Sequence, residues 1–473
     1  MSLKSLTTLL LASISTLVSA SPPPSAYQSP TTPSVEGPTS PGTRPNAFSS
    51  FLGNLTQIGY IEEEFFYSGN ATRYNLVGGE VTLDGKFSLT VNSTAAYKTR
   101  ILIRRPANPK NFNGDAILEW NNVSDGFDLV ISDHPGVYQA GYIFAGVTAQ
   151  KVGVDGEGDN PLGLRQWDSE RYGSLSIADD ALSYDIYTQA ANAVRHNAGN
   201  MIGGYKVEHI FATGESQSGT RMLAYADGVQ PISNAFDAIL PVIAFGMAAD
   251  FDPAQANPVI GQAARAFPAR IRDDLKIPVF EVNSESETLN VTWGDAEQPD
   301  TDRFRYWETA GAAHLNTGVF ADTEGFAARD GLPPLSLSNL SLSQVDWRVP
   351  LEAAYRHTSL WVRTGKAPPS FPKLERGHNG SFLVRDADGN SIGGVRLPEI
   401  TVPIAAYSGL SLNSLGSTTP FSDARLKQLY PTHEDYVAKI TAAAKKAECE
   451  GIILSYKVPE YIMDAVAANI PPK

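Results

Sequence analysis

The chain has 473 residues, of which 42% are hydrophobic and 19% charged, so it can bury the core of a globular protein. Its 51 acidic residues outnumber 37 Lys and Arg, and the net charge of −14 repels nucleic acid and anionic lipid. The single cysteine, Cys449, excludes an internal disulfide and any cluster of thiolate metal ligands. We therefore expect no nucleic-acid partner and no metal site.

The first 20 residues are typical of a signal peptide. Lys4 precedes an apolar stretch over residues 6–18, and the small residues Ser19 and Ala20 follow, so cleavage is expected after Ala20. The stretch is too short for a permanent membrane-spanning helix, and no later stretch is long enough. The sequence predicts a secreted protein without a membrane span, with an N-terminal anchor as the alternative.

Residues 21–47 contain 8 Pro and 9 Ser or Thr, a composition that cannot bury a core and predicts a disordered leader. Folding is expected to begin near Phe48, with residues 48–473 as a single domain. Asn-x-Ser/Thr sequons beyond the leader make the protein a candidate glycoprotein. They lie at Asn54, Asn70, Asn92, Asn122, Asn290, Asn339 and Asn379.

Strand and helix patterns alternate along the chain. Runs rich in Ile, Leu, Val and aromatic residues predict strands over residues 97–104, 116–120, 142–147, 207–213, 238–242, 278–282 and 304–308. Apolar residues recur with helical spacing over residues 177–194 and 350–362. This alternation predicts an α/β fold with a mostly parallel sheet that helices cover on both faces.

A hexapeptide with the spacing of a nucleophile turn, Gly-Glu-Ser-Gln-Ser-Gly over residues 214–219, follows the predicted strand 207–213. In such a turn the residues two before and two after the nucleophile face each other, so both must be small. Ser216 as the nucleophile places Gly214 and Ser218 there, whereas Ser218 would require the β-branched Thr220. We therefore predict Ser216, the alternative being an ordinary turn capped by serine.

The partners of a nucleophilic serine follow downstream. Residues 277–287 predict a buried strand and a loop with two carboxylates, Glu285 and Glu287. Residues 305–314 predict another strand, followed by a Gly/Ala loop that ends in His314. Serine, acid and histidine thus stand in the chain order of the α/β-hydrolase fold, each just past the carboxyl end of a strand.

With this constellation the chain resembles the α/β-hydrolase superfamily, and more specifically a group of secreted or bacterial α/β-hydrolase-domain proteins with a Gly-x-Ser-Gln-Ser-Gly turn. The similar segments are residues 119–124, 171–175, 214–219, 284–287 and 310–314. The resemblance implies an α/β-hydrolase fold and a serine-dependent hydrolase that acts most often on carboxylic esters.

Roles can be assigned to the predicted site residues. His314 is the natural base for Ser216, because it alone among seven histidines follows a late strand within a small-residue loop; a surface histidine is the alternative. The superfamily places the acid three residues after the small residue that ends the strand, which maps Ser284 to Glu287. Glu285 remains the other choice for the acid.

Two backbone N–H groups are needed to stabilise the oxyanion of an acyl-transfer reaction. One is expected from Gln217, directly after the nucleophile. The other is expected from the loop after strand 116–120, where we predict Val123, with the register open by one or two residues.

Residues 244–272 are a candidate cap, and residues 366–473 form a C-terminal extension with a predicted helix over 433–447. No phosphate-binding or dinucleotide fingerprint is present, so no cofactor is implied. The sequence favours a secreted serine hydrolase that cleaves an ester or lactone of a small molecule through an acyl-enzyme. The alternatives are an acyltransferase or non-hydrolytic enzyme on the same fold, and an inactive binding protein.

Overall fold

The computed structural model describes residues 32–156, 162–251, 266–288, 295–334, 342–378, 382–410 and 415–472. The predicted signal peptide lies outside these residues, as do the sequons at Asn290, Asn339 and Asn379 and residues 252–265 of the candidate cap. Within the described residues, no helix has both the length and the hydropathy of a membrane span.

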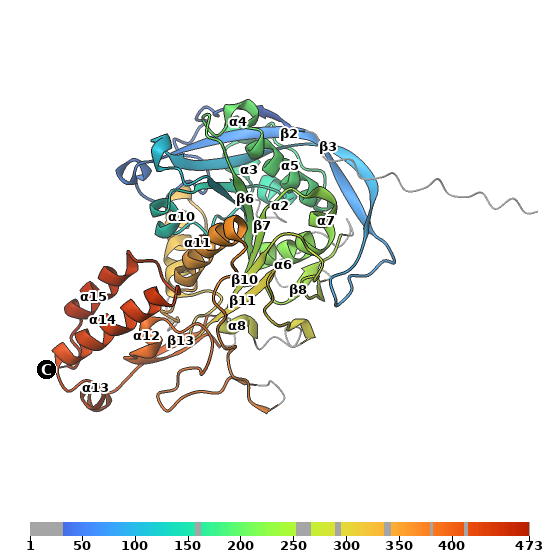
Figure 1. Cartoon of the computed structure of the whole chain (residues 1–473). Coiled ribbons are helices and arrows are strands. Elements are labelled where there is room, and N and C mark those ends of the chain that lie inside the picture. Colours follow the sequence, from blue (N-terminus) through green and yellow to red (C-terminus); the bar gives the residue numbers. More distant parts are fainter. Residues whose placement is uncertain are drawn as a thin grey trace, which may run out of the picture.

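A nine-stranded sheet forms the centre of the molecule, with the order β1-β2-β3-β5-β4-β6-β7-β10-β11 (Figure 1). The six strands from β5 to β11 in this order run parallel, whereas β1, β2, β3 and β5 pair antiparallel. The strands are β1 (Ser34–Glu36), β2 (Tyr60–Leu76), β3 (Leu89–Pro106), β4 (Asp115–Trp120), β5 (Ile143–Val147), β6 (His209–Glu215), β7 (Ala238–Val242), β10 (Val279–Ser284) and β11 (Phe304–Thr309). The predicted α/β fold is confirmed.

Successive strand residues enter two different cores because side chains alternate across a strand. In β6, Ile210 and Ala212 join the cluster on one face, and Phe211 joins the cluster on the other. Helices α5 and α6 cover the first face, and α11 covers the second (Figure 1). The sheet is therefore buried on both sides, and the carboxyl ends of its parallel strands are left to carry a site.

The predicted helices are present, with small shifts at their ends. Residues 177–194 give a short 3₁₀ turn and then α5, and residues 350–362 lie within α11, which Gly365 ends in a left-handed conformation at φ 73°. The helices up to this point are α1 (Pro135–Gln139), α2 (Lys151–Asp155), α3 (Leu164–Trp167), α4 (Ser169–Tyr172), α5 (Ser183–Arg195), α6 (Gln217–Ala224), α7 (Gln230–Ser233), α8 (Glu285–Thr288), α10 (Thr317–Asp330) and α11 (Arg348–Thr364).

The prediction of a disordered leader up to residue 47 is wrong for its described part. Ser34–Glu36 adds strand β1 to the sheet edge, and the backbone N–H groups of Thr43 and Arg44 donate to the Asp168 carboxylate at 3.2 and 3.0 Å. The Arg44 guanidinium also lies 4.5 Å from the Trp167 ring centre. The composition argument failed because strand pairing and hydrogen bonds to the domain hold this segment, which adds only a few apolar side chains to the core.

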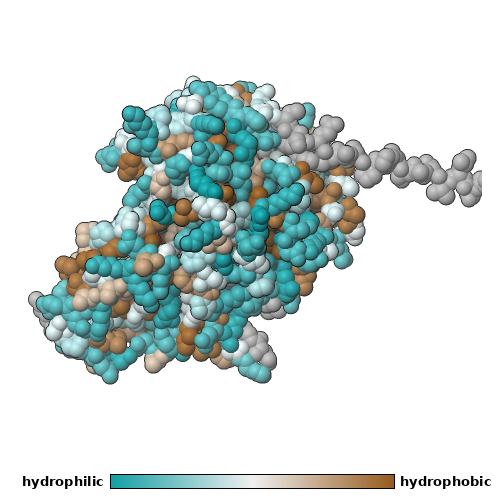
Figure 2. Space-filling view, in the orientation of Figure 1, coloured by the Kyte–Doolittle hydropathy of each residue, from teal (hydrophilic) through white to brown (hydrophobic). Residues whose placement is uncertain are grey.

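The C-terminal extension packs beside β11, shares the core on the α11 side of the sheet, and encloses a small further core between its last helices (Figure 1). Its elements are α12 (Pro398–Thr401), β12 (Ala405–Ser408), β13 (Ser417–Pro420), α13 (Asp423–Leu429), α14 (His433–Cys449) and α15 (Lys457–Ala467). In the candidate cap, the described residues form the two-stranded sheet of β8 (Met247–Ala249) and β9 (Ala266–Pro268). Hydrophilic residues cover most of the face in Figure 2, with hydrophobic residues in scattered groups.

Candidate active site

Ser216 stands at the sharp turn between β6 and α6. Its backbone has φ 56° and ψ −115°, a conformation that residues with a side chain rarely adopt. The Ser216 N–H donates to the Val242 carbonyl at 3.0 Å, which fixes the turn against the neighbouring strand β7. Strained conformations of this kind persist where the surroundings over-determine them, often at functional sites.

The residues on either side of Ser216 explain why its hydroxyl is available. A Cβ atom on Gly214 would lie 2.9 Å from the Ser218 carbonyl oxygen, so this position requires glycine. The Ser218 hydroxyl is buried and both donates to the Glu215 carbonyl and accepts from the Glu215 N–H, each at 2.8 Å. Ser218 therefore serves the turn itself, whereas the Ser216 hydroxyl points elsewhere.

Hydrogen bonds link Ser216 to His314 and His314 to Glu287. The Ser216 Oγ lies 2.8 Å from His314 Nε2, and His314 Nδ1 lies 2.6 Å from Glu287 Oε1. The Glu287 side chain is fully buried, and the His314 side chain is 13% exposed. The structure thus brings together the three residues that the sequence selected as nucleophile, base and acid, from the ends of β6, β10 and β11.

Glu287 is oriented by the strand end that precedes it. Its Oε2 accepts from the Ser284 N–H at 2.8 Å and from the Ser284 hydroxyl at 2.6 Å, while the Ser286 N–H donates to Ser284 Oγ at 3.1 Å. This reciprocal pattern is a capping box, Ser-x-x-Glu, at the start of α8. One carboxylate oxygen caps the helix, and the other is left for the histidine.

The alternative acid, Glu285, has a different set of partners. Its Oε1 accepts from the Gly311 N–H at 2.6 Å, and its Oε2 accepts from the Gly409 N–H at 2.8 Å and from Arg385 at 3.1 Å. Both oxygens therefore connect the loop after β11 to the C-terminal extension. Glu285 holds the surroundings of His314 rather than the imidazole itself.

Two further contacts to His314 were not predicted from the sequence. The His314 N–H donates to Ser286 Oγ at 2.9 Å, and the Ser286 hydroxyl donates to the Gly409 carbonyl at 2.6 Å. The Phe245 ring stacks on the imidazole, with ring centres 5.1 Å apart and planes at 23°. Ser286 could have been found from the capping box, whereas no local signal relates Phe245 or Gly409 to a histidine so far away in the chain.

The two predicted oxyanion donors, the N–H groups of Val123 and Gln217, lie on two segments that a hydrogen bond connects. The Asn122 side-chain amide donates to the Glu215 carbonyl at 2.8 Å, so the loop after β4 is fastened next to Ser216. The Ser124 N–H donates to Asn122 Oδ1, whereas the Val123 N–H and the Gln217 N–H have no acceptor among the described residues. Both N–H groups are thus left available, as an oxyanion hole requires.

A pair of buried carboxyl groups lies directly behind this turn. Glu119 and Glu215 are both fully buried, and a negative charge on Glu119 disfavours ionisation of Glu215. Burial raises the pKa of Glu119 to about 8, and burial together with the charge of Glu119 raises the pKa of Glu215 well above its usual range. Glu119 also accepts from the N–H groups of Ile131 and Ser132, at 2.7 and 3.1 Å.

Among the described residues, no group of three or more His, Cys, Asp or Glu side chains is arranged to hold a metal ion.

The profile of a family described as "Alpha/beta hydrolase domain" matches residues 35–463. The chain belongs to this family. No curated protein is significantly similar to the sequence. The match begins inside the segment expected to be a leader, in agreement with the position of β1.

Several solved structures with a limited likeness to this α/β hydrolase are described as esterases. Brefeldin A esterase, described as a bacterial homologue of human hormone-sensitive lipase, has 13% identity and a TM-score of 0.20, over 37% of this chain and 40% of that chain. The rice cell wall degrading esterase LipA from Xanthomonas oryzae has 12% identity and a TM-score of 0.22, over 40% and 44%. A fungal esterase from Rhizomucor miehei has 13% identity and a TM-score of 0.28, over 56% and 84%. The first two matches span less than half of the known chains.

Proposed function

We propose that this α/β hydrolase is a secreted serine hydrolase that cleaves a carboxylic ester or lactone of a small organic molecule. The observation that carries the proposal is the hydrogen-bonded row of Ser216, His314 and Glu287, with distances of 2.8 and 2.6 Å. Secretion rests on the signal-peptide pattern of residues 1–20.

The geometry supports a two-step acyl transfer. Ser216 Oγ attacks the acyl carbon while its proton moves to His314 Nε2, and the protonated His314 then gives this proton to the leaving alcohol. Water, activated by the same imidazole, hydrolyses the acyl-enzyme and releases the acid. Glu287, which accepts from Nδ1, keeps the tautomer that leaves Nε2 free to accept a proton and stabilises the imidazolium.

The oxyanion that forms on the acyl carbonyl needs donors from the protein. The N–H groups of Val123 and Gln217 are the proposed donors, since neither is used within the described residues. Loss of one such donor costs about 3 kcal/mol of transition-state stabilisation. The hydrogen bond from the Asn122 side chain to the Glu215 carbonyl holds the segments that carry Val123 and Gln217 at a fixed separation.

A hydrolysis screen tests the proposal. The purified protein should hydrolyse at least one of a set of short-chain, long-chain, aromatic and lactone esters, and Ser216→Ala should lose the activity. Covalent labelling by a fluorophosphonate without hydrolysis of any ester would instead favour an acyltransferase or a non-hydrolytic enzyme. A protein that neither hydrolyses esters nor reacts with the probe would contradict the proposal and favour a binding role.

A further inference from the structure

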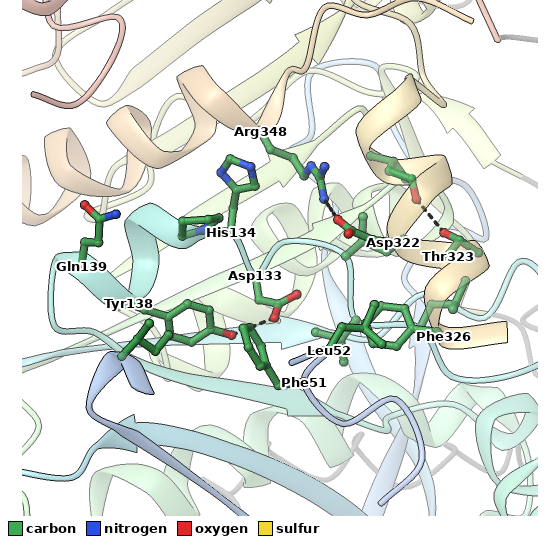
Figure 3. A pocket seen from close by; sticks show the side chains of 16 residues that line it. Phe51, Leu52, Asp133, His134, Tyr138, Gln139, Asp322, Thr323, Phe326 and Arg348 are labelled. Atoms are coloured by element: carbon green, nitrogen blue, oxygen red, sulfur yellow. Dashed lines mark hydrogen bonds and ion pairs between the residues drawn. The ribbon is translucent and has the colours of Figure 1, made fainter. Parts of the chain in front are cut away.

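A cavity of about 320 Å³ is lined by none of the residues Ser216, His314 and Glu287. Its walls come from the loop before β2, the segment leading into α1, helix α10 and the first turn of α11 (Figure 3). Small-molecule sites usually have volumes of roughly 300 to 1,000 Å³. The cavity therefore has room for a compact organic molecule.

Two walls of the cavity are continuous with the candidate active site. Leu129, which lines the cavity, exchanges two backbone hydrogen bonds with Asn122, at 3.0 and 2.8 Å. Helix α10, which contributes Val319 and Phe326, begins three residues after His314. The cavity thus lies behind the two segments that carry the proposed oxyanion donor and the base.

Most of the lining is apolar. Phe51, Leu52 and Phe326 lie next to one another on one side of the cavity in Figure 3, and Leu129 and Val319 add aliphatic surface. Ile58 also lines the cavity and is 51% exposed, which marks the side where the cavity meets solvent. A ligand would gain most of its affinity by burying an apolar body here.

The basic side chains at the cavity wall are already paired with carboxylates. Arg348 is bound to Asp346 at 2.7 Å and also to Asp322 at 2.5 Å. The His134 ring, also part of the lining, is paired through Nδ1 with Glu352. An incoming carboxylate would therefore find no unpaired cation among the described lining residues.

Asp133 offers a hydrogen-bond acceptor instead. Its Oδ2 accepts from Arg104 at 2.6 Å and from the Tyr138 hydroxyl at 2.7 Å, and Oδ1 has no donor among the described residues. The side chain is only 10% exposed and lines the cavity near its middle (Figure 3). An acceptor in this position favours a ligand with a hydroxyl group and repels a carboxylate.

We propose that this cavity is a second small-molecule site, which takes a neutral, mostly apolar alcohol or phenol whose hydroxyl donates to Asp133 Oδ1. Its link to the reaction rests on the proposed function, because hydrolysis of an ester releases one alcohol and one acid. The cavity would accept the alcohol product and reject the acid product. It would therefore distinguish the two halves of a substrate after cleavage.

Titration calorimetry with two probes of the same shape tests this site. The protein is used as Ser216→Ala, so that binding does not depend on turnover, and is titrated with 2-naphthol and with 2-naphthoate. We expect 2-naphthol to bind and 2-naphthoate to bind at least tenfold more weakly. Equal binding of the two probes, or no binding of 2-naphthol, would overturn the proposal whatever the outcome of the hydrolysis screen.

Two variants that fill the cavity locate the binding. Thr323→Trp on α10 and Leu52→Trp in the N-terminal loop should each weaken 2-naphthol binding at least tenfold. Leu360→Trp adds the same side chain at an exposed position of α11 and should leave binding unchanged. Unchanged 2-naphthol binding by a folded Thr323→Trp or Leu52→Trp protein would place the probe elsewhere and overturn the assignment.

Discussion

The nucleophile side and the acid–histidine side of the candidate site are built in different ways. Ser216 is held by a turn of six residues, with one further hydrogen bond to Val242 on the adjacent strand. His314 is held through Ser286 by Gly409, a residue of the C-terminal extension. A short motif can thus specify the position of Ser216, whereas the position of His314 depends on a segment almost 100 residues further along the chain.

The largest expected effect lies on the nucleophile side. Ser216→Ala should abolish covalent labelling by a fluorophosphonate, because the attacking oxygen is removed. Ser218→Ala is the matched control: it loses two hydrogen bonds within the turn and costs about 1 to 3 kcal/mol of stability, but should keep most of the labelling. Labelling that survives in the first variant and disappears in the second would move the nucleophile to Ser218.

On the acid side, substitutions of the two glutamates should affect different quantities: kcat for Glu287, and the free energy of unfolding for Glu285. Glu287→Gln should lower kcat by roughly three to four orders of magnitude, because His314 loses the partner that sets its tautomer. Glu285→Gln should affect the free energy of unfolding more than kcat, since it weakens the contacts to Arg385 and Gly409. Steady-state kinetics and urea unfolding of both variants give the comparison, and a larger loss of kcat in Glu285→Gln would reverse the assignment.

Loss of the hydrogen bonds that connect His314 through Ser286 to the extension should lower activity less than Glu287→Gln. Ser286→Ala leaves the His314 N–H and the Gly409 carbonyl without their shared partner, which costs about 1 to 3 kcal/mol. We expect kcat to fall about tenfold or more while KM changes little, because the imidazole is displaced rather than the substrate. Ser455→Ala, at an exposed position of the extension, is the control, and equal kinetics of the two variants would show that this link does not position the base.

The buried pair Glu119 and Glu215 should make stability depend on pH. Their pKa values in the folded protein are raised above those of the unfolded chain, so the folded protein holds more protons between pH 4.5 and about 8. Stability should therefore decrease as pH rises through this range, by at most about 1.4 kcal/mol per pH unit for each proton held. Glu215→Gln removes one of the two titrating groups and should flatten the slope in urea unfolding at several pH values.

The surface variant Glu460→Gln serves as the control for this slope, because Glu460 is 45% exposed and pairs only with Lys457 among the described residues. A slope equally steep in Glu215→Gln and in the wild-type protein would show that other groups set the pH dependence.

The smallest expected effect is the absence of a glycan at Asn122, a sequon beside Ser216. Asn122 is 2% exposed, and the amide nitrogen that a glycan would occupy donates to the Glu215 carbonyl. Asn122 should remain bare when the protein is produced through a secretory pathway that glycosylates, in contrast to the exposed Asn54. Glycopeptide mass spectrometry measures both sites, and substantial occupancy at Asn122 would contradict the position of this loop.

The parallel strands and the order of serine, acid and histidine could be predicted from the sequence because each depends on local pattern. Strand β2 was missed, since three consecutive glutamates interrupt its apolar pattern. In the structure their charges are balanced by arginines on β3, through the pairs Glu62–Arg104, Glu63–Arg105 and Glu64–Arg100. The sequence does not show which basic residues will face a run of acidic ones.

The choice between Glu285 and Glu287 as the acid also depended on distant partners that the sequence does not show. The capping box of Ser284 and Glu287 is a local signal, but the partners that occupy Glu285, Arg385 and Gly409, lie about 100 residues later in the chain. Phe245 was missed for a related reason, because ring stacking on His314 joins two loops from different strand ends. What local pattern cannot show is which distant segments meet.

The attachment of His314 to Gly409 also has a meaning for biosynthesis. A chain is made from its N-terminus, so Ser216, Glu287 and His314 leave the ribosome well before Arg385 and Gly409 are added. Until then the loop after β11 lacks the support that it receives from the C-terminal extension through Ser286 and Glu285. Under the proposed function, a growing or truncated chain would be less active toward the esters of the cell that makes it, and the order of synthesis would delay full activity.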